Sequence, residues 1–214
     1  MSHCASVEST GQGSKVSVND AAPGSPAAAR PSPARRRRRR SCWLRWLAVP
    51  VVVVIVFAGA TARLLVWPAR GDPRHADAIV MLNGGGNRLA VALDLGWSHV
   101  APYLVISRGS TYWGHGSVCA PAIPRVKVIC FDPSPNTTQG EAEFVGKEAE
   151  RYHWKSIILV TSTAQDTRAR LRVGRCFHGH ISVVTINPTM SQWPYAIVYE
   201  WAALAKAVLI QRSC

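Results

Sequence analysis

The sequence predicts an α/β protein in which one transmembrane helix precedes a parallel, doubly wound sheet with helices on both faces. Three observations lead to this. Short apolar runs alternate with helical stretches over residues 77–214, a seventeen-residue stretch before them has no charge, and the residues before that are polar and basic. With 48% apolar and 17% charged residues, the chain as a whole is not disordered.

Residues 1–45 are predicted to form a disordered, basic, cytoplasmic tail. Residues 1–34 are rich in Ser, Gly, Ala and Pro and lack aromatic residues, so they bury too little apolar surface to offset chain entropy. Six consecutive arginines follow at 35–40. The tail holds nine basic and two acidic side chains, a net +7 out of the +13 of the whole chain. Because the excess belongs to one segment, it does not imply a nucleic-acid-binding domain, and we expect no nucleic-acid partner.

Residues 46–67 are predicted to form a transmembrane helix that acts as a signal anchor. The uncharged run 46–62 spans about 26 Å as a helix, and extension to Trp67 with a snorkelling Arg63 gives about 33 Å, against roughly 30 Å of hydrocarbon. The arginines on its N-terminal side place that side in the cytoplasm and the rest of the chain outside. The alternative is a cleaved signal peptide, because Ala60-Thr61-Ala62 resembles a cleavage site.

After a Pro- and Gly-containing linker at 68–76, apolar runs and helical stretches alternate to the end of the chain. The runs with strand character are Ala78–Leu82, Tyr103–Ile106, Val126–Cys130, Ser156–Val160 and Ile181–Ile186. The stretches with helical periodicity are Leu89–Gly96, Thr138–Tyr152, Asp166–Phe177 and Trp193–Ile210. Continuous apolar strands separated by helices are typical of a parallel sheet covered on both faces. In such sheets ligands bind beyond the carboxyl ends of the strands, so the loops there are the candidate site.

Four loops meet at that edge. In the first, Asn83, Gly84, Gly85 and Gly86 can bring backbone N–H groups to an anion at a helix N-terminus, and Arg88 adds a fixed charge. The second loop begins with Ser107. The third presents the hydroxyls of Thr137 and Thr138 and the carboxylate of Glu141. A tight turn and a helix cap are the alternative interpretations of the first and third loops.

The fourth loop contains Ser162 and Gln165 and leads into a helix. Arg168 and Arg172 are four residues apart on this helix and therefore share a face near the strand end, where they could clamp a phosphate-bearing ligand. An exposed, solvated face is the alternative. We expect Arg168 to lie outside the core, so that its replacement changes folding little.

These motifs together resemble a known family. The segment Asp77-Ala-Ile-Val-Met-Leu-Asn-Gly-Gly-Gly-Asn-Arg-Leu89, then Val105–Gly109, Thr137–Ala142 and Val160–Ser162 with Arg168-Ala169, is similar to the YdcF/SanA/ElyC family. The resemblance runs from about Asp77 to Ile186. It implies a Rossmann-like α/β domain over 77–214, often tethered by one N-terminal membrane helix, with a role in bacterial envelope integrity.

The chain departs from the family pattern at one chemically important position. Gln165 stands where the family usually has a His in the loop after the fourth strand, so the obvious general base is missing. Glu141 remains as the candidate catalytic residue. Whether the protein is an enzyme is therefore left open, and ligand binding is the firmer expectation.

Cysteines and histidines complete the candidates. Cys119, Cys130, Cys176 and Cys214 follow the membrane segment, and in an oxidising compartment they allow three complete pairings. A Cys119–Cys130 bond closes the shortest loop, which the chain-entropy model values at about 3 kcal/mol, while buried free thiols are the alternative. His178 and His180 have no neighbouring ligands to complete a metal shell, and no metal site is expected.

The sequence thus predicts a single-pass plasma-membrane protein whose extracytoplasmic α/β domain binds a small anionic ligand, phosphate-bearing or nucleotide-like, and serves envelope maintenance. The alternative is a non-catalytic binding or scaffold module of the envelope. The residues identify no cofactor and no substrate.

Overall fold

The computed structural model describes residues 48–68, 71, 75–108, 119 and 122–214. The predicted tail (1–45), the first two residues of the predicted span and most of the linker lie outside the described residues. Among these described residues one helix, Ala48–Val66, has the length and mean hydropathy (2.4) to cross a membrane. Its last five residues, Ala62–Val66, form a π-helix.

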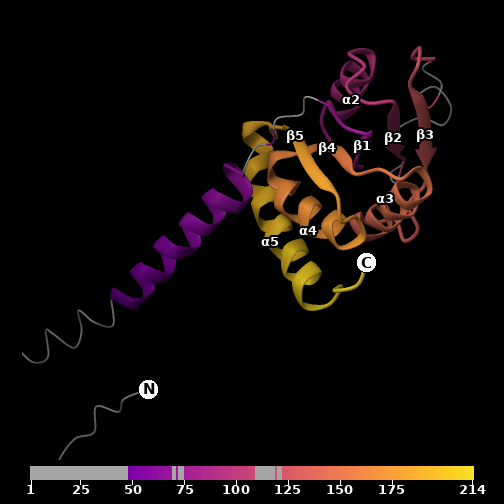
Figure 1. Ribbon diagram of the computed structural model, residues 1–214. Helices are drawn as coiled ribbons and strands as arrows, with labels where there is room; N and C mark the ends of the chain where they lie inside the picture. The colour runs from indigo at the N-terminus through magenta and orange to yellow at the C-terminus, as the bar shows by residue number, and fades with distance from the viewer. Residues whose placement is uncertain (1–47, 69–70, 72–74, 109–118, 120–121) are drawn as a thin grey trace, which may run out of the picture. The chain divides into compact units, whose positions relative to one another are not determined.

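The domain is a five-stranded parallel sheet with the order β3-β2-β1-β4-β5 (Figure 1). The strands are β1 (Ala78–Met81), β2 (Tyr103–Ser107), β3 (Lys127–Phe131), β4 (Ser156–Ser162) and β5 (His180–Ile186). The helices are α2 (Arg88–Trp97), α3 (Thr138–Tyr152), α4 (Asp166–Cys176) and α5 (Trp193–Leu209). The predicted α/β, Rossmann-like fold is confirmed, and the order reverses beside β1, where such sheets bind ligands.

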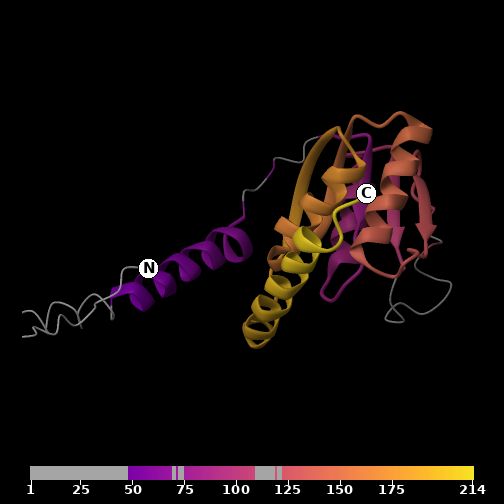
Figure 2. The same cartoon turned by 90° about the horizontal axis from the view of Figure 1, so that it is seen from below.

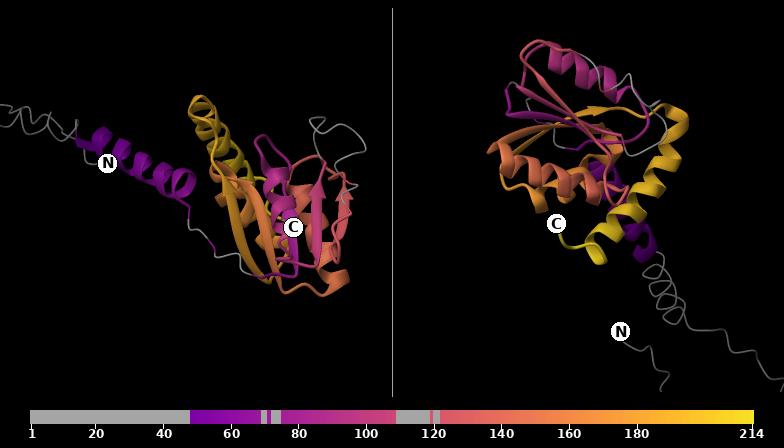
Figure 3. Two further views of the ribbon diagram at one scale, coloured as in Figure 1. Left: turned by 90° about the horizontal axis from the view of Figure 1, so that it is seen from above. Right: turned by 90° about the vertical axis from the view of Figure 1, so that its right-hand side faces the viewer.

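The sheet separates two hydrophobic layers because alternate side chains of each strand point to opposite faces. Val80 and Leu159 face α3 and α4, whereas Ile79 and Val160 face α2. The right-hand view of Figure 3 shows α2 on one side of the strands and α3 and α4 on the other, and Figure 2 shows these two helices in front of the sheet. Both faces are thus covered, which explains the continuous apolar runs of the central strands.

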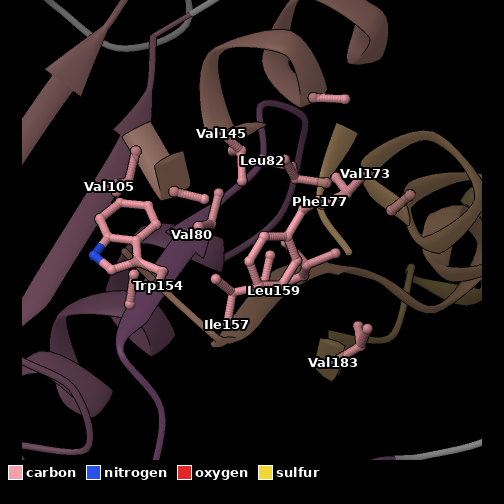
Figure 4. Close-up of a cluster of buried hydrophobic side chains, with 14 of the residues drawn as sticks. Val80, Leu82, Val105, Val145, Trp154, Ile157, Leu159, Val173, Phe177 and Val183 are labelled. Carbon is pink, nitrogen blue, oxygen red and sulfur yellow. The ribbon is translucent and has the colours of Figure 1, made fainter. Parts of the chain in front are cut away.

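The layer under α3 and α4 contains the largest side chains of the core. Figure 4 shows Trp154 and Phe177 packed around the aliphatic residues of β1 and β4. In contrast, the α2 layer is almost wholly aliphatic. On the α3 and α4 face the apolar layer ends at the carboxyl edge of the sheet, where Ser107 and Thr161 are fully buried.

Two disulfides lie in the domain. Cys119 bonds Cys130, as the spacing of the cysteines predicted, and Cys176 bonds Cys214. The second bond joins the end of α4 to the C-terminal residue, a pairing that the sequence left open.

Candidate functional site

A cavity of about 740 Å³ opens at the carboxyl edge of the sheet. Among the thirteen predicted site residues, all except Ser107 line it. They come from the loop after β1, the start of α3, the end of β4 and the first turns of α4. The structure therefore brings the first, third and fourth candidate loops to one cavity, whereas Ser107 of the second loop does not line it.

The glycine loop is shaped by Arg88, the first residue of α2. Gly84 and Gly86 have φ angles of 144° and 93°, which side chains disfavour. A Cβ atom on Gly84 would lie 2.6 Å from the Arg88 guanidinium, so this guanidinium fills the space under the loop. Arg88 Nη1 donates hydrogen bonds to the carbonyl oxygens of Leu82 (3.2 Å) and Asn83 (2.7 Å).

Arg88, which the sequence analysis expected to add a fixed charge to this loop, is only 4% exposed. Burial lowers the pKa of this guanidinium to about 10, against the opposing influence of Glu141 and Glu200. Its Nε has no hydrogen-bond partner within the described part of the chain. Arg88 therefore supplies a buried positive charge whose hydrogen bonds go only to main-chain carbonyls.

Glu141 connects the glycine loop to α3. Its Oε1 accepts a hydrogen bond of 2.6 Å from the backbone N–H of Asn83, and the carboxyl group is 2% exposed. Burial raises the pKa of Glu141, although the Asn83 N–H, the Ser107 hydroxyl and the charges of Arg88 and Arg168 favour the ionised form. The carboxyl group thus retains its proton at higher pH than an exposed Glu does.

The start of α3 is both a helix cap and a wall of the cavity. The side chain of Thr137 accepts a hydrogen bond from the Gly140 N–H at 3.5 Å, as a helix cap does. A Cβ on Gly140 would lie 2.1 Å from the carbonyl oxygen of Pro135, so only glycine fits there. Thr138 Oγ1 accepts hydrogen bonds from Arg168 Nη1 (2.6 Å) and Gln165 Nε2 (3.5 Å).

Arg168 is paired within the protein. Its Nε and Nη2 donate to the two carboxylate oxygens of Glu200 at 2.7 and 2.8 Å, and the two side chains are 11% and 6% exposed. Burial lowers the pKa of Arg168, but the hydrogen bonds and charge of Glu200 outweigh it and raise this pKa overall. The expectation that Arg168 lies outside the core is therefore wrong, because a partner from α5 makes its burial favourable.

Arg172 lies next to Arg168 on the helix but is bound to the C-terminal segment. Its Nη1 donates to the Gln211 carbonyl oxygen at 2.7 Å and its Nη2 to the Gln211 side chain. Arg175 donates to the carbonyl oxygen of Ala207 at 2.9 Å. The alternative of an exposed, solvated face is thus wrong: Arg168 and Arg172 both line the cavity, and both have intramolecular partners.

Two further predicted residues differ in depth. Ser107, at the end of β2, is fully buried below Glu141 and contributes to its environment rather than to the cavity wall. Ser162, at the end of β4, is half-buried and lines the cavity. Ser162 is therefore part of the cavity wall, whereas Ser107 is not.

Helix α5 forms a wall that the sequence analysis missed. It contributes Tyr195, Tyr199, Glu200 and Lys206 to the cavity lining. The two tyrosine rings stack with centroids 5.9 Å apart, and the Arg168 guanidinium lies 5.8 Å from the centroid of Tyr199. The signal available in the sequence was Glu200, the one acidic residue in a mostly apolar helix whose other charged residue is Lys206. A buried acid in such a helix requires a cationic partner.

The cavity is electropositive. The N-terminal ends of α2, α3 and α4 contribute lining residues, and each such end carries roughly half a positive charge. Four basic side chains line it (Arg88, Arg168, Arg172 and Lys206) against Glu141 and Glu200. Among the described residues, no group of three or more His, Cys, Asp or Glu is arranged to hold a metal ion.

Comparisons with protein-family models, with curated proteins and with solved structures gave no match. The fold and the cavity together define an α/β domain with an electropositive pocket at the switch point of its sheet.

Proposed function

We propose that this cavity binds a small anionic ligand, phosphate-bearing or nucleotide-like. The observation that carries the proposal is the convergence of the glycine loop and three helix N-termini on one cavity that contains the buried, positively charged Arg88. A neutral Glu141 would donate a hydrogen bond to an anion rather than repel it. The ring of Tyr199, which is 51% exposed, offers an apolar surface on which a planar group can stack.

We further propose that the domain works outside the cytoplasm, tethered by the helix Ala48–Val66, and serves cell-envelope maintenance. The apolar helix, the arginines on its N-terminal side and the two disulfides support this location. The resemblance of the loop motifs to the YdcF/SanA/ElyC family supports the envelope role. A non-catalytic binding module uses the same cavity, and the proposal extends to turnover only if Glu141 exchanges a proton with the ligand.

Gly85 offers a direct test of the anion site. It is exposed, its φ is not positive, and a Cβ there would meet no atom within 4 Å, so a side chain is accommodated without strain. We expect Gly85→Asp to weaken the binding of inorganic phosphate by about fivefold or more, because a new unit charge at ~4 Å costs at least about 1 kcal/mol. The measurement is calorimetric titration of the full-length protein in detergent.

Gly85→Ala is the matched control, since it adds the Cβ without the charge. It should bind phosphate as the wild type does. Equal phosphate affinity in the Asp and Ala variants would refute an anion site at the glycine loop.

A further inference from the structure

Helix α5 carries an exposed apolar face. Tyr195, Val198 and Leu209 are 74%, 72% and 65% exposed, and Ala202 and Ala205 between them are also exposed. Steps of three and four residues place these five side chains on one face of a helix. Glu200 and Ala207, which are buried against the domain, lie on the opposite face. A continuous apolar strip of this kind marks a surface that is covered by something else.

The strip borders the apolar helix Ala48–Val66. Trp201, one residue before Ala202, stacks on Phe57 with ring centroids 5.2 Å apart. Its indole Nε1 donates a hydrogen bond of 3.0 Å to Thr61 Oγ1. Residues Val49–Cys214 form one compact unit, so these contacts lie within it.

The end of the apolar helix is also attached to the domain. Leu65 is 1% exposed, and the hydroxyl of Thr167 in α4 donates to the carbonyl oxygen of Leu64. The connection between helix and domain at this point is therefore a packed contact, not a free tether.

These contacts determine how deep α5 lies if the helix spans a bilayer. Nineteen helical residues measure about 28 Å, close to the roughly 30 Å of hydrocarbon. Thr61 and Phe57 precede Val66 by five and nine residues, which places them about 8 and 14 Å inside the end of the span. A side chain that contacts both, as Trp201 does, must lie at or below the level of the lipid headgroups.

We infer that α5 lies in the outer interface of the membrane with its apolar strip against the lipid chains. The inference rests on the proposed spanning by Ala48–Val66 and goes beyond it. The composition of α5 fits, because Trp193, Tyr195, Tyr199 and Trp201 are of the type enriched at membrane interfaces. Lys206 and Arg212 are exposed and can reach lipid phosphates. Since α5 is also a wall of the cavity, the anion site is held next to the bilayer.

The test is photo-crosslinking of the full-length protein in nanodiscs of phosphatidylethanolamine and phosphatidylglycerol. A diazirine amino acid replaces Val198 or Ala205 in the strip. The same amino acid at Val53 tests whether the helix Ala48–Val66 contacts lipid. Trp97, an equally apolar residue that is 53% exposed on α2, is the matched control. Lipid adducts are quantified by mass spectrometry, and an unchanged melting temperature shows that each variant is folded.

We expect the probes at Val198 and Ala205 to capture lipid several-fold more than the probe at Trp97. If the probe at Val53 captures lipid but the probes at Val198 and Ala205 capture no more than the probe at Trp97, the placement of α5 is wrong. The spanning by Ala48–Val66 would then still hold. Absence of lipid capture at Val53 would overturn the spanning and the inference together. If the probe at Val198 links two protein chains and captures no lipid, α5 is a dimer interface. That result would also overturn the placement of α5 against lipid.

Discussion

Two buried arginines in the same cavity differ in how their charges are balanced. Arg168 has a carboxylate partner, Glu200, and its pKa is raised overall. Arg88 donates only to main-chain carbonyls, and its pKa falls to about 10 because of burial. The difference shows that a cation lining a cavity is not equivalent to a cation available to a ligand. In the proposed function Arg88 supplies the charge that attracts the anion, while Arg168 uses its charge to attach α5 to α4.

Breaking the Arg168–Glu200 pair should produce the largest effect. Arg168→Met leaves the carboxylate of Glu200 buried without its partner, and we expect a loss of about 3 to 5 kcal/mol in the free energy of unfolding. The measurement is denaturant unfolding of the full-length protein in detergent. The double variant Arg168→Met with Glu200→Leu should recover most of the loss, because neither charge remains. A double variant as unstable as the single one would show that the pair is not the cause.

Replacing Arg88 should affect binding more than the loss of the Arg168 pair does. Arg88→Met removes a charge that forms no salt bridge among the described residues. We expect sulfate to bind ten- to 150-fold more weakly, as for loss of one charged hydrogen bond of about 1.5 to 3 kcal/mol. Titration calorimetry measures this. The stable Arg168→Met, Glu200→Leu double variant is the control and should keep its sulfate affinity. If both variants lose affinity equally, the distinction between the two arginines fails.

The pH dependence of binding should show a smaller effect that depends on Glu141. Below its raised pKa Glu141 is neutral, and above it the carboxylate repels an anion by about 1 kcal/mol at ~4 Å in a water-like dielectric. Sulfate is a suitable probe because its charge is constant over this range. Affinity should fall as the pH rises in the wild type, and Glu141→Gln should remove the slope. If the sulfate affinity of the variant depends on pH as that of the wild type does, another group causes the pH dependence.

Stability should depend on the same group. The pKa of Glu141 is higher in the folded state than its ordinary value of 4.5, so the folded state binds more protons between the two values. The free energy of unfolding should therefore decrease as the pH rises from about 4.5 through the raised pKa. The free energy of unfolding is measured for the wild type and for Glu141→Gln at several pH values in this interval. The difference between their pH dependences is the contribution of Glu141, and identical pH dependences would contradict the prediction.

The sequence by itself determined the elements, because their signals are local. The strands β1 to β5 and the helices α2 to α5 lie within about one or two residues of their predicted ranges, as expected when apolar runs, caps and glycines act over a few positions. The meeting of the glycine loop with Thr138 and Glu141 followed from one general property: parallel strands end at a common edge. The Cys119–Cys130 bond was likewise indicated by its short loop.

Only the tertiary structure decided which charges are free and which are paired. Glu200 is 32 residues from Arg168, and Cys214 is 38 residues from Cys176, so no local spacing relates these partners. The folding back of Arg88 beneath Gly84 depends on the positive φ of that glycine and on the depth of the loop. The pairing of Arg168 depends on how α5 packs against α4, and packing between distant segments leaves no periodic trace in the sequence. For this reason the position of the site could be predicted, but the roles of its arginines could not.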